Sequence, residues 1–228
     1  KDKGDLDRAI YQYELALEIQ PQFYQAYNNI GVARQESGKL KDAMENYNKA
    51  LNIKPDNAQA YRNIGVLFYE QKEFEAAIKN YEQALSIRPD YIEAYNNIGE
   101  ALEGQGKLAA AIECYERSLR INPDNHEVLA RKLARQANVC AWSSIEKDRK
   151  LIAHLGTSGE PVTPLDLLAL EDAPERHKLR SEIYSRNRYR QEPLSFDSQL
   201  RKKTERLRIG YFSADFRNHA VAYSMARI

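Results

Sequence analysis

Three asparagines at a constant spacing are the residues best suited to hold another chain. Asn29, Asn63 and Asn97 are 34 residues apart, and each directly precedes an Ile-Gly pair. An asparagine side chain carries a carbonyl acceptor and an amide donor, which match the N–H and C=O of a peptide unit. If the three lie on one face of stacked helices, they form a ladder that binds an extended peptide or protein substrate in a concave groove. The alternative is that they satisfy local backbone groups between helices.

His219 is the residue best placed for proton transfer. A segment with alternating apolar residues, 207–213, favours a strand, and after a short loop a helix is expected from about Ala220. Ligands bind at the carboxyl ends of strands in α/β sheets, and the free N–H groups at a helix start favour anions. Imidazole, with an ordinary pKa of about 6.5, exchanges protons near neutrality. His219 is therefore a candidate base or acceptor-positioning group, with Asp215 and Asn218 beside it; the alternative is that it hydrogen-bonds the loop backbone.

Other residue types recur at the same step and predict the elements that position these side chains. The recurring sets are Ala9, Ala43, Ala77 and Ala111; Tyr13, Tyr47, Tyr81 and Tyr115; Leu17, Leu51, Leu85 and Leu119; Ile19, Ile53, Ile87 and Ile121; Pro21, Pro55, Pro89 and Pro123; and Gly31, Gly65 and Gly99. Small residues let two helices approach, large apolar ones fill the space between them, and proline ends the second helix. The pattern resembles the tetratricopeptide repeat, a helix–turn–helix unit of 34 residues, and predicts an all-α superhelix.

The repeats define the first domain, residues 1–125. Residues 1–23 match only the second helix of a repeat. Because such a helix leaves its inner face uncovered, we expect the natural chain to extend upstream of Lys1. The three full repeats are 24–57, 58–91 and 92–125.

Two further domains are expected after the repeats. Residues 126–205 form a helical connector and linker, and residues 206–228 begin an α/β domain with the strand at 207–213. In the connector we expect helices at 126–136, at 140–155, from Pro164, and from Pro174 to about residue 189. Four residues are expected to form the apolar face of the Pro164 helix: Leu165, Leu167, Leu168 and Leu170.

Two segments after the repeats resemble an enzyme family. Residues 140–142 read Cys-Ala-Trp, and residues 206–219 read Arg-Leu-Arg-Ile-Gly-Tyr-Phe-Ser-Ala-Asp-Phe-Arg-Asn-His. Placed after tetratricopeptide repeats, both resemble the SPINDLY-like O-linked N-acetylglucosamine transferase family, glycosyltransferases of the GT-B type. Arg217, Ala220 and Tyr223 depart from the pattern of the animal enzymes, which places the chain nearer the bacterial branch and leaves the sugar open.

The resemblance implies a function for the full-length protein. It would transfer a sugar from a nucleotide-sugar donor similar to UDP-GlcNAc to Ser or Thr of proteins. His219 would be its catalytic residue, and Asn29, Asn63 and Asn97 would bind the protein substrate. These 228 residues would hold no cofactor, and they would be inactive alone because one strand and one loop cannot make a two-lobed cleft.

Two interpretations without catalysis stay open. The chain could be an adaptor that docks a peptide, or an assembly protein that oligomerises through its repeats. Adaptors that clamp a terminal carboxylate need several basic groove residues. Of the residues directly before the three asparagines, only Arg62 is basic, so that role is disfavoured.

Composition and spacing argue against other classes. No apolar run approaches the ~20 residues of a membrane span, and the histidines and cysteines lack metal-ligand spacing. Residues 126–228 hold 19 basic and 13 acidic groups, an excess too small to bind nucleic acid on charge alone. We therefore expect a cytoplasmic protein with no metal, no membrane contact and no nucleic-acid partner.

Overall fold

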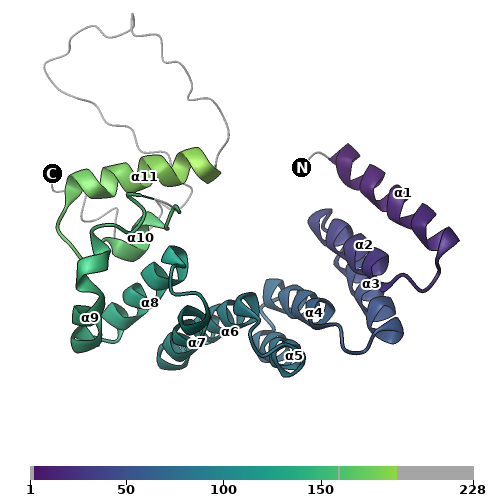
Figure 1. Ribbon diagram of the computed structural model, residues 1–228, viewed down its shortest axis with the longest axis horizontal. Coiled ribbons are helices and arrows are strands. Elements are labelled where there is room, and N and C mark those ends of the chain that lie inside the picture. Colours follow the sequence, from purple (N-terminus) through teal and green to yellow (C-terminus); the bar gives the residue numbers. More distant parts are fainter. Residues whose placement is uncertain (1–2, 159, 189–228) are drawn as a thin grey trace, which may run out of the picture. The chain divides into compact units, whose positions relative to one another are not determined.

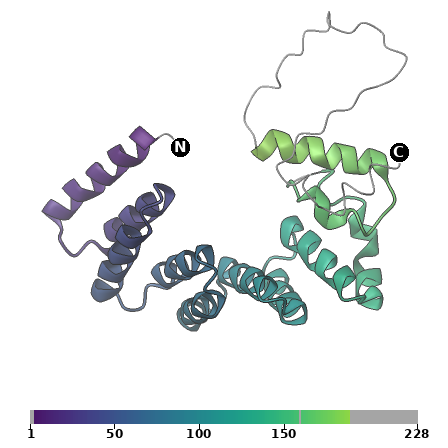
Figure 2. The ribbon, with the colours of Figure 1, turned by 180° about the vertical axis from the view of Figure 1, so that it is seen from behind.

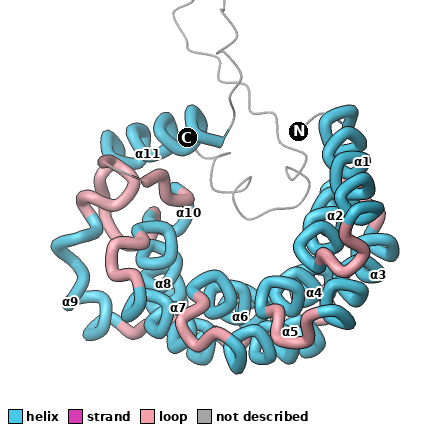
Figure 3. Tube along the Cα trace, turned by 45° about the vertical axis from the view of Figure 1, so that its right-hand side comes forward, coloured by secondary structure: helices cyan, strands magenta, loops and turns pink. Residues whose placement is uncertain are grey.

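The computed structural model describes residues 3–158 and 160–188. This part of the chain is built of helices joined by turns (Figure 1), and the tube in Figure 3 contains no strand within it. The predicted all-helical repeat solenoid is therefore confirmed. The expected strand at 207–213 and His219 lie outside the described residues.

The helices of the repeat region follow one another in pairs. They are α1 (Lys3–Ile19), α2 (Tyr24–Glu36), α3 (Leu40–Ile53), α4 (Ala58–Glu70), α5 (Phe74–Ile87), α6 (Ile92–Gly104), α7 (Leu108–Ile121) and α8 (His126–Asn138). We call α2, α4 and α6 first helices and α3, α5 and α7 second helices, because each pair lies within one 34-residue repeat. By the same register α1 is a second helix. Each of these helices packs against the next one in the chain, an order that can be followed from both sides in Figures 1 and 2.

Within each pair a tyrosine ring of the second helix lies directly against a glycine of the first. Tyr47, Tyr81 and Tyr115 are fully buried, as are the alanines four residues before them. A Cβ atom added to Gly31 would overlap the Tyr47 ring, and the same holds for Gly65 with Tyr81. Glycine is thus the residue that lets the ring lie directly on the first helix, and the pair buries a large aromatic surface.

The turn between the two helices of a pair also repeats. Gly38, Lys72 and Gly106 occupy the same position in the three repeats and have φ angles of 74°, 62° and 75°. This left-handed conformation ends a helix most easily at glycine, which has no Cβ to clash with the following carbonyl. Lys72 keeps the turn in the middle repeat, although a lysine there is strained.

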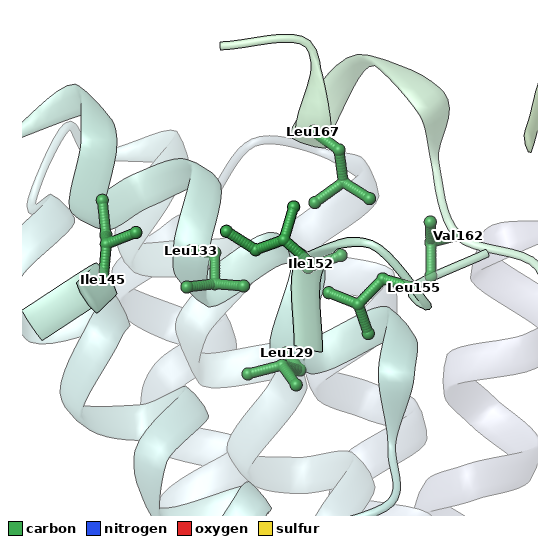
Figure 4. Packing of buried hydrophobic residues seen from close by; sticks show 8 residues of the cluster. Leu129, Leu133, Ile145, Ile152, Leu155, Val162 and Leu167 are labelled. Carbon is green, nitrogen blue, oxygen red and sulfur yellow. The ribbon is translucent and has the colours of Figure 1, made fainter. Parts of the chain in front are cut away.

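Three helices after α8 cover the end of the repeat array. They are α9 (Trp142–Ile152), α10 (Pro164–Leu167) and α11 (Pro174–Arg188). Side chains from α8, α9, α10 and the loop between α9 and α10 form one apolar cluster, shown in Figure 4: Leu129, Leu133, Ile145, Ile152, Leu155, Val162 and Leu167. This cluster removes the outer face of α8 from water, which an exposed end of a repeat array requires.

The prediction that four leucines form the apolar face of the Pro164 helix is wrong for two of them. Leu165 is 74% exposed and Leu168 is 52% exposed, whereas Leu167 is fully buried and Leu170 packs against the cluster. The reason is the length of α10. With only four residues it has no second turn, so the helical spacing of the leucines does not apply.

A buried arginine ties α11 to the end of α9. The Arg180 side chain is fully buried; its Nε donates to the carbonyl of Leu155 at 2.7 Å and its Nη2 to that of Ile152 at 2.6 Å. Its third nitrogen pairs with Glu171. Burial raises the pKa of Glu171, but hydrogen bonds from Arg176 and Arg180 outweigh it and hold that pKa below its ordinary value. Arg180 thus donates to the Leu155 carbonyl and gives the Ile152 carbonyl a second donor beside the Leu155 N–H.

Candidate peptide-binding groove

Two of the three predicted asparagines, Asn63 and Asn97, take part in side-chain hydrogen bonds between first helices. Asn63 Nδ2 donates to Asn28 Oδ1 at 3.2 Å, which joins α4 to α2. Arg62 Nε donates to Asn97 Oδ1 at 3.2 Å, which joins α4 to α6. Arg62 Nη1 also lies 3.4 Å from Asn63 Oδ1. Each helix-to-helix bond spans 35 residues, one more than the repeat.

The three predicted site residues do not share one surface. Asn63 is only 5% exposed, and both ends of its amide have partners in the protein, so its side chain connects repeats instead of facing a groove. Asn97 is half-buried and lines a hollow toward α8, whereas Asn29 is half-buried and lines another hollow toward α1. Binding of an extended chain by all three therefore stays a prediction.

The hollow at Asn97 lies along the inner faces of α4, α6 and α8. Its volume is about 260 Å³, and we call it the inner groove. Its lining residues are Arg62, Glu93, Asn96, Asn97, Glu100, Asn125, Glu127, Val128 and Arg131. Amides, carboxylates and guanidinium groups dominate this lining, so the groove can both donate and accept hydrogen bonds.

The two arginines of the inner groove differ in their charge partners. Arg131 pairs with Glu100 and, at 3.2 Å, with Glu127. Burial lowers the pKa of Arg131, but the neighbouring Glu100 outweighs this and raises it above its ordinary value. Arg62, in contrast, donates only to the neutral amide oxygens of Asn63 and Asn97, and it makes no ion pair within residues 3–158 and 160–188. Arg62 is therefore a cation whose charge a ligand can neutralise.

The hydroxyl of Tyr81, whose charge neighbours include Arg62, lacks the acceptor that its counterparts in the other two repeats have. The Tyr47 hydroxyl donates to Gln35 at 2.9 Å, and the corresponding hydroxyl of Tyr115 donates to Glu103 at 2.8 Å. Tyr69 stands at the equivalent position in the middle repeat, and the buried Tyr81 hydroxyl has no hydrogen-bond partner in the described part of the chain. Burial raises the pKa of Tyr81, while the charge of Arg62 acts in the opposite direction.

Other kinds of site are not found in the described residues. These ranges contain no group of three or more His, Cys, Asp or Glu side chains placed to hold a metal ion. Within the same ranges no helix is both long and apolar enough to cross a membrane. The candidate catalytic residue, His219, lies outside the described part and stays a prediction.

The fold is that of a helical-repeat protein, and two models of known repeat families match its sequence. A family model described as TPR repeat matches residues 1–38, 34–72 and 65–106, and a model described as tetratricopeptide repeat matches residues 92–125. Together these matches cover residues 1–125, more than half of the chain. The chain belongs to the tetratricopeptide-repeat family.

Solved structures support the same fold. PilF of Pseudomonas aeruginosa is 26% identical, with a TM-score of 0.64 over 81% of this chain and 85% of its own. MamA is 21% identical, with a TM-score of 0.53 over 81% of this chain and 92% of its own. The first tetratricopeptide repeat domain of Spaghetti (RPAP3), solved with an HSP90 peptide, is 24% identical, with a TM-score of 0.50 over 52% of this chain and 94% of its own.

No curated protein matches the chain significantly in sequence. The family-model matches end at residue 125. Neither they nor the structures named above support the resemblance to a glycosyltransferase family.

The internal hydrogen bonds of the ladder predict unequal effects of removing its members. Asn63→Ala removes the donor to the buried Asn28 Oδ1 and one of the two acceptors of Arg62, and we expect it to lower the free energy of unfolding by about 1–2 kcal/mol. Asn29→Ala removes no hydrogen bond within the described residues, so its effect should stay within about 0.5 kcal/mol. Denaturation in urea measures both, and equal effects of the two changes would contradict a structural role for Asn63.

Proposed function

We propose that the repeat region binds an extended segment of another protein along the inner groove. The observation that carries the proposal is Arg62, a cation on the first helix α4 that lines the groove and has only neutral partners among the described residues. An acidic side chain of a bound segment would neutralise Arg62 through a charge-assisted hydrogen bond. Asn96 and Asn97 of the same groove would hold the backbone of that segment.

The family supports this proposal. Tetratricopeptide repeats are protein-interaction modules, and the repeat domain of Spaghetti was solved with the HSP90 peptide SRMEEVD. A clamp for a terminal carboxylate is a poor fit here, because Arg131 is already paired with Glu100 and Glu127. We therefore propose that an internal acidic residue, rather than a chain end, meets Arg62.

Selection of 12-residue peptides from a random library tests the proposal. Peptides retained by the chain should contain Asp or Glu, and their Kd should rise about tenfold for Arg62→Ala, the equivalent of about 1.4 kcal/mol. Arg117→Ala is the matched control, since Arg117 is exposed on α7 and does not line the groove. Peptides that bind the Arg62→Ala and Arg117→Ala variants equally well would place binding elsewhere.

We also propose, as a second function, that in a longer protein this groove recruits substrates for sugar transfer. The supporting observation is the sequence of residues 206–219, which resembles the start of an O-linked N-acetylglucosamine transferase catalytic domain. A nucleotide-sugar donor similar to UDP-GlcNAc would then supply the sugar, and His219 would act as base or position the acceptor. The catalytic part of this proposal lies outside the described residues.

His219→Ala in the full-length protein tests the second function. Incorporation of labelled sugar into protein should be lost while the melting temperature stays unchanged, because the residue would act on the reacting groups. Residues 1–228 alone should show no incorporation, since catalysis requires a complete cleft. Near-normal turnover of the variant would remove His219 from the mechanism.

A further inference from the structure

The side-chain hydrogen bonds between neighbouring first helices follow a register that is broken in the inner groove. The two bonds described above each join residues 35 positions apart. At the same spacing, the next pair is Asn96 of α6 and Arg131 of α8. These two residues make no such bond in the described part of the chain, and Arg131 pairs instead with Glu100 and Glu127. Asn96 and Arg131 both line the inner groove, so the groove lies where this third bond is missing.

The missing bond leaves a buried acceptor in the groove. Asn96 Oδ1 is shielded from solvent and has no hydrogen-bond partner among the described residues. A buried acceptor without a partner is costly, so a ligand that donates to it recovers that cost on binding. An amide oxygen accepts hydrogen bonds and cannot donate them, so the ligand group at this position must carry an N–H or an O–H.

A carboxylate without a charge partner lies next to this acceptor. Glu93 is three residues before Asn96 on α6, a spacing that places two side chains on the same side of a helix. Glu93 also lines the inner groove, and it is exposed and makes no ion pair within residues 3–158 and 160–188. In the two earlier first helices the same position holds a neutral glutamine, Gln25 or Gln59. The helix α6 therefore combines an unpaired carboxylate with an unused acceptor.

The charges that line the inner groove favour a ligand with a positive group. The lining contains three carboxylates and two guanidinium groups, an excess of one negative charge: Glu93, Glu100 and Glu127 against Arg62 and Arg131. A ligand that brought only an acidic side chain to Arg62 would increase this excess. A ligand that brings a cation as well leaves the total unchanged, and it matches the signs of both unpaired groups.

We propose that Glu93 and Asn96 form a second subsite of the inner groove, which binds a lysine of the segment whose acidic residue meets Arg62. This inference rests on the proposed function and specifies the charge pattern of the partner. A lysine ammonium group has three N–H donors, so it can donate to the Glu93 carboxylate and to Asn96 Oδ1 at the same time.

The closeness of the two subsites sets the spacing of the two charges in the ligand. Arg62 Nε bonds the side chain of Asn97, which follows Asn96 in the sequence and lies one helical turn after Glu93. In an extended chain, neighbouring side chains point to opposite sides, whereas every second side chain points to the same side at a separation of about 6.5 Å. The lysine is therefore expected two residues before or after the acidic residue.

A random peptide library with glutamate fixed at its centre tests the spacing. Among the peptides that the chain retains, lysine should be enriched at one of the two positions that lie two residues from the glutamate. The double variant Glu93→Gln/Asn96→Ala should lose this enrichment, because both acceptors of the ammonium group are gone. Glu113→Gln is the matched control and should keep it, since Glu113 is exposed on α7 and does not line the groove.

A pair of peptides measures the contribution of the lysine. In the second peptide, uncharged norleucine of similar length replaces the lysine of the best retained sequence. Its Kd for the unchanged chain should be higher by about fivefold, the upper end of what an exposed ion pair contributes. The double variant should bind the two peptides equally well, because the cycle of changes isolates the interaction of the lysine with its subsite.

A single variant guards against a loss of folding. Glu93 lies in the first turn of α6, where a carboxylate stabilises the helix, so its removal also acts on the fold. Asn96→Ala removes no hydrogen bond within the described residues, and its circular dichroism should match that of the unchanged chain. This variant alone should reduce the enrichment of lysine.

The outcomes separate this inference from the proposed function. If the retained peptides depend on Arg62 but show no enrichment of lysine, or if the double variant enriches lysine equally, the lysine subsite is overturned and the acidic contact stands. If no peptide is retained, or if retention does not depend on Arg62, the proposed function fails together with this inference.

Discussion

The contact of a glycine with a tyrosine ring sets the geometry of the repeat region. In each complete repeat the ring of the second helix lies on the backbone of the first, where any other residue would intrude. Close packing of this kind leaves little room for adjustment, because protein interiors are packed as densely as crystals of small molecules. The first helices therefore recur in a fixed orientation, and the same side of each one faces inward.

The hydrogen-bonded ladder and the inner groove depend on this orientation. With the first helices held at a constant distance, Asn63 reaches Asn28 and Arg62 reaches Asn97 across neighbouring repeats. These bonds use the asparagines inside the protein and leave Arg62 charged, without an acidic partner among the described residues. The same side chains thus connect the repeats and define where a ligand can bind.

Much of the repeat region could be predicted from the sequence, because the residues that shape it are local and periodic. The glycine, alanine, tyrosine and proline positions predicted the helix pairs, whereas the left-handed turn residues Gly38, Lys72 and Gly106 were found only in the structure. The family of the repeats was predicted correctly. The hydrogen-bond partners of Asn63 were not predicted. Its bond to Asn28 joins residues 35 positions apart, and such a bond depends on how neighbouring first helices face each other, which the period alone does not specify.

The region after the repeats was harder to predict because it lacks a period. The buried Arg180 gave no signal in a sequence rich in exposed basic residues, and its role follows only from the two carbonyls it meets. The leucines around Pro164 suggested a longer helix than the four residues that form. The resemblance of residues 206–219 to a glycosyltransferase falls outside the described residues and stays a prediction.

The effect of Gly65→Ala on stability tests the central contact most directly. In a helix free of that contact, alanine is more favourable than glycine by roughly 0.5–1 kcal/mol, so the change would stabilise the protein. Against the buried Tyr81 ring, the added methyl group should instead destabilise it by about 1–3 kcal/mol. The double change with Tyr81→Leu should recover part of this loss, because the smaller side chain makes room. Denaturation curves that show Gly65→Ala to be stabilising, or no recovery in the double variant, would contradict the account.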